Sequence, residues 1–171
     1  METFLSQNAF ISMVTAAVEA YPEETLGILM GLRGRNAIWV QYAVVYQTAE
    51  REKMEVKAHP IRALRTNRFL ENMTKLEMAG DFHSHTKVQI DGITGIRLSR
   101  ADKNSMAVKD LGIVIAINKD TKTRKWRHLP KGSLKGGVFP YSLKIVSYFK
   151  AKKTKYEISK IECPFALGLG L

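Results

Sequence analysis

The run Asp81-Phe82-His83-Ser84-His85 holds the two histidines that are best placed to bind a metal ion. If the run is an extended strand, side chains alternate between its two faces, so His83 and His85 project from the same face. Two imidazoles that converge on one point are typical of metal ligands. The spacing alone is a weak signal, because a lone histidine on an apolar background is more often a hydrogen-bonded structural residue. The pair predicts a metal centre only together with a third ligand.

Two acidic residues further along the chain, Asp91 and Asp102, are candidates for that third ligand. The run from Ser99 to Asp102 is also typical of a helix start, in which the acidic side chain caps backbone N–H groups. This structural interpretation competes with a ligand role. Beside a histidine pair, however, Ser99 and Asp102 together favour an oxyanion donor and a metal ligand.

A hydrolytic site also needs a general base, and the turn before Leu26 offers Glu23 and Glu24. Two histidines and one carboxylate leave one position of a zinc ion open for water, whose pKa falls to about 7 in favourable sites. A further carboxylate then accepts the proton and later returns it to the leaving amine. An acid at a turn is by default a solvated residue, so residue type alone does not decide between these roles.

Hydrophobic periodicity predicts the elements that would position these residues. Helical spacing predicts helices over Phe4 to Ala20 and Pro60 to Met78, the second ended by Gly80, and a capping signal predicts a third over Ser99 to Val108. The predicted strands are Leu26 to Leu32, Ala37 to Tyr46, Leu111 to Asn118, Arg124 to Leu129, Tyr141 to Phe149 and an edge strand at Lys155 to Ile161, with a glycine-rich loop at Lys131 to Gly137. This order indicates an α/β fold class, as a sandwich with a mixed sheet.

Composition limits the classes of protein that remain. A chain of 171 residues, 45% of them hydrophobic, has the length and apolar content for one core, so we expect a single domain over residues 1–171. The only cysteine, Cys163, forms no internal disulfide and excludes cysteine-rich zinc sites. No signal peptide or membrane span is evident, which predicts a cytoplasmic protein without a membrane partner.

The net charge of +11 is concentrated in the last third of the chain, residues 119–171, which carries 13 basic and 3 acidic residues. Such a segment attracts anionic partners without naming them, and it is equally well explained as a solvated lysine-rich surface. We expect acidic protein surfaces as partners rather than nucleic acid, because no reading surface of aromatic residues and no helix-turn-helix is evident. Trp126, among Arg124, Lys125 and Arg127, is better explained as one core-facing residue on a surface strand.

Three motifs in this order resemble the JAMM or MPN-type metalloprotease family. They are Glu24 at the start of a glycine-containing apolar strand, the His83-Ser84-His85 run, and Ser99-Arg100-Ala101-Asp102. The resemblance covers most of the chain. It implies one zinc ion bound by His83, His85 and Asp102, Glu24 as the general base, and Ser99 as the residue that stabilises the oxyanion. It further implies a fold similar to that of cytidine deaminases and a free-standing prokaryotic member of the family.

The resemblance also implies an activity. Members of the family hydrolyse an isopeptide or peptide bond at the C-terminus of a ubiquitin-like protein modifier, which is the partner we expect. The chain departs from the family pattern between His85 and Ser99, where Thr86 replaces the usual proline and thirteen residues replace seven. We interpret residues 86–98 as an insertion beside the substrate groove and keep Asp91 as the alternative third ligand.

Other protein classes fit the same residues less well. A zinc deaminase needs more than one cysteine, and a zincin needs a His-Glu-x-x-His motif that does not occur. An iron oxygenase uses the same three ligand types but has no evident use for Glu24 and Ser99. The remaining alternatives are an inactive scaffold of the JAMM type and a basic domain that binds nucleic acid or protein.

Overall fold

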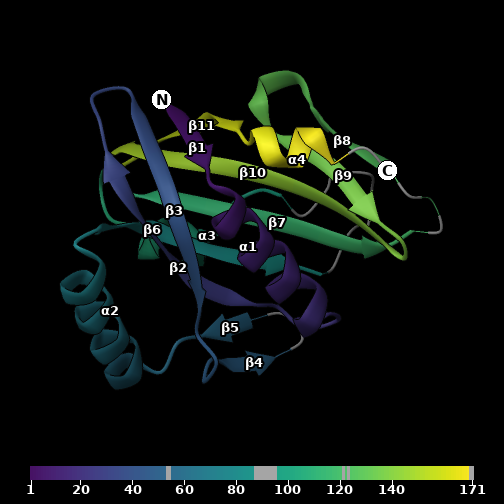
Figure 1. The fold of residues 1–171 in the computed structure, drawn as a ribbon. Helices are drawn as coiled ribbons and strands as arrows, with labels where there is room; N and C mark the ends of the chain where they lie inside the picture. Colours follow the sequence, from purple (N-terminus) through teal and green to yellow (C-terminus); the bar gives the residue numbers. More distant parts are fainter. Residues whose placement is uncertain (53–54, 87–95, 121, 123, 170–171) are drawn as a thin grey trace.

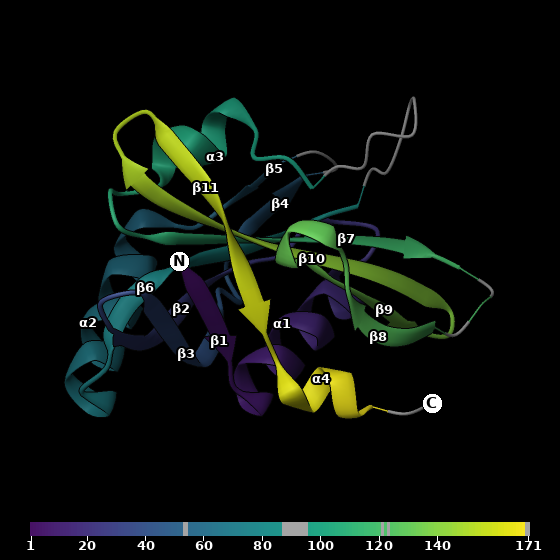
Figure 2. The same ribbon diagram turned by 90° about the horizontal axis from the view of Figure 1, so that it is seen from above.

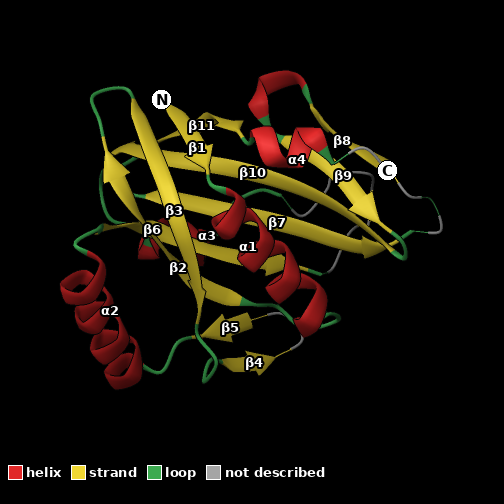
Figure 3. Ribbon diagram, viewed as in Figure 1, coloured by secondary structure: helices red, strands yellow, loops and turns green. Residues whose placement is uncertain are grey.

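The computed structural model describes residues 1–52, 55–86, 96–120, 122 and 124–169, and within them strands predominate over helices (Figure 3). The helices are α1 (Gln7–Ala20), α2 (Pro60–Thr74), α3 (Arg100–Ser105) and α4 (Pro164–Gly168), with a short 3-10 turn η1 (Pro130–Gly132). The strands are β1 (Glu2–Leu5), β2 (Leu26–Arg33), β3 (Ala37–Val45), β4 (Glu50–Glu52), β5 (Glu55–Lys57), β6 (Glu77–His85), β7 (Leu111–Lys119), β8 (Arg124–His128), β9 (Leu134–Val138), β10 (Tyr141–Lys152) and β11 (Lys155–Glu162).

The main sheet closes on itself. In the described residues its strand order is β11-β1-β3-β2-β6-β7-β10-β9-β8, and β11 also pairs with β10. Thr3 of β1 links the closing strands, because its buried hydroxyl lies 2.9 Å from that of Ser147 on β10 and 2.7 Å from that of Ser159 on β11. The prediction of an α/β protein with a mixed sheet is confirmed, but the sheet forms a barrel rather than one layer of a sandwich. Likewise, β11 is not an edge strand, since it pairs on both sides.

Helices α1 and α3 lie on opposite sides of β7 (Figure 2). Every residue of β7 from Leu111 to Ile117 is buried, which confirms the prediction from its unbroken apolar run. On one face, which α1 crosses in Figure 1, Ile113, Ile115 and Ile117 join the main core. On the other face, Val114 packs with Leu98 and Met106, which flank α3. Packing against β7 therefore fixes the position of α3 relative to the neighbouring strand β6.

The first two predicted helices have different starts and ends. Phe4 and Leu5 belong to β1, and α1 begins only after Ser6, whose hydroxyl accepts a hydrogen bond of 3.1 Å from the N–H of Ala9. Helix α2 ends at Thr74, because Lys75 takes a left-handed conformation with φ of 55°. β6 then starts at Glu77, so the predicted helix is four residues too long.

Two predictions based on glycine are wrong, the helix end at Gly80 and the loop at Lys131 to Gly137. Gly80 does not end a helix but lies inside β6, where its φ of 147° brings the backbone against the carbonyl of Leu111 on the parallel strand β7. The predicted glycine-rich loop contains strand β9, because the ring of Trp126 packs directly on Gly136 and leaves no space for a side chain. Trp126 is 5% exposed, as expected for a core-facing residue.

The other predictions about fold have mixed outcomes. Cys163 is buried and carries a free thiol. Among the described residues, no helix has the length and apolar character needed to cross a membrane. The likeness to cytidine deaminases stays a prediction. So does the assignment of the whole chain to one domain.

Candidate metal centre

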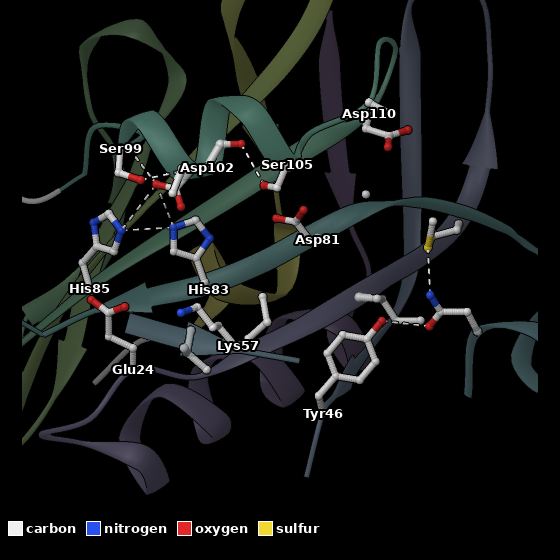
Figure 4. Close-up of a pocket in the computed structure, with 18 residues that line it drawn as sticks. Glu24, Tyr46, Lys57, Asp81, His83, His85, Ser99, Asp102, Ser105 and Asp110 are labelled. Atoms are coloured by element: carbon white, nitrogen blue, oxygen red, sulfur yellow. Dashed lines mark hydrogen bonds and ion pairs between the residues drawn. The ribbon is translucent and has the colours of Figure 1, made fainter. Parts of the chain in front are cut away.

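Three side chains converge where β6 ends beside α3 (Figure 4). The Nε2 atoms of His83 and His85 are 3.0 Å apart, and the Oδ2 atom of Asp102 lies 3.5 Å from the first and 3.9 Å from the second. His83 is only 6% exposed. The prediction that both imidazoles project from one face of a strand is confirmed, since both belong to β6 at a spacing of two residues.

The pairing of β6 keeps this geometry rigid. His83 pairs with Leu26 of β2 on one side and with Val114 of β7 on the other. His85 pairs with Ala116 of the same parallel strand. Because β6 is paired on both sides at His83 and with β7 at His85, both imidazoles are carried by the sheet rather than by a loop.

Asp102 reaches the histidines from the first turn of α3, and it also caps that helix. Its Oδ2 accepts a hydrogen bond of 2.6 Å from the N–H of Ser99, and the hydroxyl of Ser99 accepts one of 3.0 Å from the N–H of Asp102. The capping interpretation from the sequence is therefore confirmed. It does not compete with a ligand role, because the oxygen that caps the helix is the same one that faces His83.

Glu24 stands on the opposite side of the histidines from Asp102, two residues before the start of β2, and Figure 4 shows its carboxylate directed towards them. The neighbouring residue Thr25 is tied to Ser84, which lies between the two histidines in sequence. The N–H of Thr25 donates to the hydroxyl of Ser84 at 2.9 Å, and the N–H of Ser84 donates to the carbonyl of Thr25 at 3.0 Å. Ser84 therefore fixes the segment that carries Glu24 against the ligand strand.

The three converging side chains line one end of a cleft with a volume of about 750 Å³. The cleft continues past Asp81 to a far end where the hydroxyl of Tyr46 donates to the amide oxygen of Asn67 at 2.8 Å. Lys57 of β5 lines it as well, on the side of Glu24 in Figure 4. A cleft of this volume lies within the range of ligand-binding sites, and its lining extends from the converging side chains to Tyr46.

Acidic groups dominate the electrostatics of the cleft. Burial is the largest influence on Asp81, and together with the charges of Asp102 and Asp110 it raises the pKa of Asp81 to about 6, against the opposing influence of His83. Burial opposes ionisation of Asp102 too, but its contacts with His83 and Ser99 hold the pKa of Asp102 well below its usual range. Burial likewise opposes the charged form of His83, yet Asp102 and then Asp81 and Glu24 raise the pKa of His83.

The arrangement of donor atoms fits a zinc ion. Two ligand atoms bound to zinc at about 2.0–2.1 Å and at tetrahedral angles lie about 3.3 Å apart. The three measured separations, 3.0, 3.5 and 3.9 Å, lie on both sides of that value. In addition, the Nε2 atoms of His83 and His85 lie 3.0 Å apart, which leaves space for a proton on only one of them. The other nitrogen then presents a lone pair, and a cation between the two rings could accept lone pairs from both.

The sequence predicts the three side chains that converge here, but not every residue of the site. His83, His85 and Asp102 form the one group of candidate metal ligands within the part of the chain that the structure describes. The alternative ligand Asp91 lies outside the described residues. No role was predicted for Ser84 or for Asp81, although the alternation of side chains already places Asp81 on the face of the two histidines.

The fold and the site define a small mixed α/β domain with a candidate centre of two histidines and one aspartate. The model for the prokaryotic homologs of the JAB domain matches residues 6–129, which is more than half of the chain and includes every residue of the centre. The chain belongs to this family, as the resemblance of its motifs predicts.

A protein from Desulfitobacterium hafniense, whose structure was determined in solution, has a similar fold. It is 18% identical, its TM-score is 0.65, and the match covers 94% of this chain and 92% of that one. At this identity the similarity concerns the fold alone. No curated protein matches the chain.

Proposed function

We propose that this protein is a zinc-dependent hydrolase that cleaves a peptide or isopeptide bond at the C-terminus of a ubiquitin-like modifier. The observation that carries the proposal is the convergence of His83, His85 and Asp102 in the lining of a cleft. Membership of the JAB family supports it. So does the position of Glu24, which faces the same point from the opposite wall.

In this proposal the two histidines and Asp102 would hold the metal, and three protein ligands are the number found in catalytic rather than structural zinc sites. A bound zinc ion would act as a Lewis acid and would lower the pKa of the water bound to it to about 7. The pairing of β6 with β2 and β7 keeps the imidazoles in place during this chemistry. Asp102 is oriented by its bond from Ser99.

Glu24 accepts the proton of the attacking water and returns it to the leaving amine. Ser84 keeps Glu24 in position, because both of its hydrogen bonds are to the adjacent residue Thr25. Ser99 stabilises the oxyanion. Its hydroxyl oxygen accepts the N–H of Asp102, so the hydroxyl proton is available for donation, and one such donor is typically worth about 3 kcal/mol in the transition state.

The expected substrate follows from membership of the JAB family, and the cleft offers it a place to bind. An extended C-terminal tail would enter along the cleft between Tyr46 and the metal centre, with its scissile bond beside Glu24. The leaving group is a lysine side-chain amine in an isopeptide or an α-amine in a linear fusion. Neither requires a further cofactor, because water is the only other reactant.

The first test is the metal content of the purified protein, measured by mass spectrometry of the ion. The wild type is expected to carry about one zinc per chain, and the double variant His83→Ala, His85→Ala is expected to carry none. His128→Ala is the matched control, because its imidazole bonds to the carbonyl of Ile161 at 2.8 Å, outside the centre. No metal in the wild type after reconstitution would favour the inactive scaffold.

The second test separates the roles of the remaining residues on a panel of ubiquitin-like fusions. Glu24→Gln is expected to keep the metal and lose turnover, whereas Asp102→Ala is expected to lose both. Full metal content in Asp102→Ala would move the third ligand to Asp91. A metal-loaded wild type that cleaves no fusion would refute the proposed activity and leave the metal site standing.

A further inference from the structure

A row of basic side chains crosses the sheet in line with the metal ligand His85. His85 of β6 pairs with Ala116 of β7, and Ala116 pairs with Lys144 of β10. Lys144 pairs in turn with Lys135 of β9, and Lys135 with Arg127 of β8. Directly paired residues point to the same face of a sheet, so Lys144, Lys135 and Arg127 share the face that carries the metal centre. We call these three residues the basic row.

The basic row begins close to the centre and extends away from it. Neighbouring strands are about 4.8 Å apart, so the backbone of Lys144 lies about 10 Å from that of His85 and the backbone of Arg127 about 19 Å. Figure 2 shows β7, β10, β9 and β8 side by side in this order. At the far end, Lys135 and Arg127 line a hollow of about 240 Å³ together with Arg124 and Lys125.

The basic row lacks compensating acids. Across the described ranges, none of its three side chains forms an ion pair, whereas neighbouring Arg124 is paired with Asp120 at 3.1 Å. Like charges on adjacent strands repel each other, which destabilises the sheet. Burial and then the charge of Lys135 lower the pKa of Lys144. An anion bound along the row would relieve this repulsion.

Two features favour a peptide over nucleic acid as that anion. The one aromatic residue of β8, Trp126, is turned into the core, so it offers no surface on which a base could stack. The row also starts at the centre where the proposed reaction places a protein chain. A peptide that leaves the centre along the sheet would meet the row with its own side chains.

We propose that the basic row is a second subsite, which binds an acidic segment of the protein substrate. An extended peptide rises about 3.3 Å per residue, so the acidic residues lie about three to six positions from the scissile bond. This inference rests on the proposed function for the direction of the bound chain. It goes beyond it by specifying the charge of the substrate on one side of the cleaved bond.

The proposal is tested by measuring peptide binding rather than turnover. All variants are made in the Glu24→Gln protein, so that no substrate is consumed. The probe is a fluorescent peptide with glutamates at these positions, beside the same peptide with glutamines, and anisotropy is measured at low salt. We expect the acidic peptide to bind roughly tenfold more tightly, and the double variant Lys135→Gln, Lys144→Gln to lose that preference. Lys152→Gln, Lys153→Gln removes the same charge from two exposed lysines at the other end of β10 and is expected to keep it.

Three results would overturn the inference. They are equal binding of the two peptides, equal loss in the control variant, and preferential binding of a single-stranded oligonucleotide of the same charge. The proposed function fails differently. A protein that binds the acidic peptide through the row but cleaves no fusion when loaded with zinc would refute the hydrolase and retain the basic row as a binding site.

Discussion

Substitution of Ser84 by alanine tests how Glu24, the proposed general base, is held in place. Ser84 is fully buried, and its hydroxyl accepts the N–H of Thr25 at 2.9 Å. In Ser84→Ala that N–H is left unpaired in the protein interior, which costs about 1–3 kcal/mol of unfolding free energy. For a chain of this size each kcal/mol lowers the melting temperature by about 2–4 °C.

The same substitution should separate metal binding from turnover. His83 keeps its pairing with β2 and β7, and His85 keeps its pairing with β7, so the variant is expected to bind zinc as the wild type does. The segment with Glu24 loses the bond from the N–H of Thr25 to the hydroxyl of Ser84, so turnover should fall. Urea denaturation, metal content and hydrolysis of a fusion measure the three effects on one preparation.

Thr25→Val is the matched control. The hydroxyl of Thr25 is buried and has no hydrogen-bond partner among the described residues, and valine has nearly the same shape. Removing an unpaired buried hydroxyl is expected to leave stability unchanged or to raise it slightly. The reasoning is refuted if Ser84→Ala unfolds at the wild-type urea concentration, or if Thr25→Val costs as much as Ser84→Ala.

Further expectations follow from close backbone contacts and from the metal. Gly80→Ala should cost about 3 kcal/mol or more in thermal unfolding, because its methyl group would overlap a carbonyl of β7 at positive φ, while Gly168→Ala, with open space around it, should be neutral. Gly136→Ala should cost about 1–3 kcal/mol by overlap with Trp126, and an unchanged urea midpoint would contradict that packing. Zinc at a hundred times its Kd should stabilise the wild type by about 2.7 kcal/mol and leave Asp102→Ala unchanged, as calorimetry with and without a chelator can show.

The sequence predicts the parts of the site that depend on local periodicity. The alternation of side chains along β6 is enough to bring His83 and His85 together, and the capping signal is enough to place Asp102 in the first turn of a helix. Which acidic residue lies beside the histidines depends on how distant segments of the chain pack together, and local periodicity does not determine that. The order of the family motifs answered it, whereas spacing alone left Asp91 as an alternative.

Closure of the sheet was not predictable in this way. It depends on the pairing of β1 with β11, in which Glu2 lies opposite Lys160. These residues are separated by nearly the whole chain, and a local sequence pattern does not predict such a contact. Glycine was misleading for a related reason. At Gly80 and Gly136 the missing side chain serves a neighbouring strand or ring, so the residue marks close packing rather than the end of an element.

Asp102 shows why a structural and a functional interpretation of one residue need not exclude each other. A free carboxylate beside two histidines would rotate and lose entropy on binding a metal. Here the N–H of Ser99 holds Oδ2 at 2.6 Å and thereby directs it towards His83 and His85. For the metal ion that we propose, the helix cap would orient this carboxylate in advance, so the same hydrogen bond that starts α3 would also lower the cost of assembling the centre.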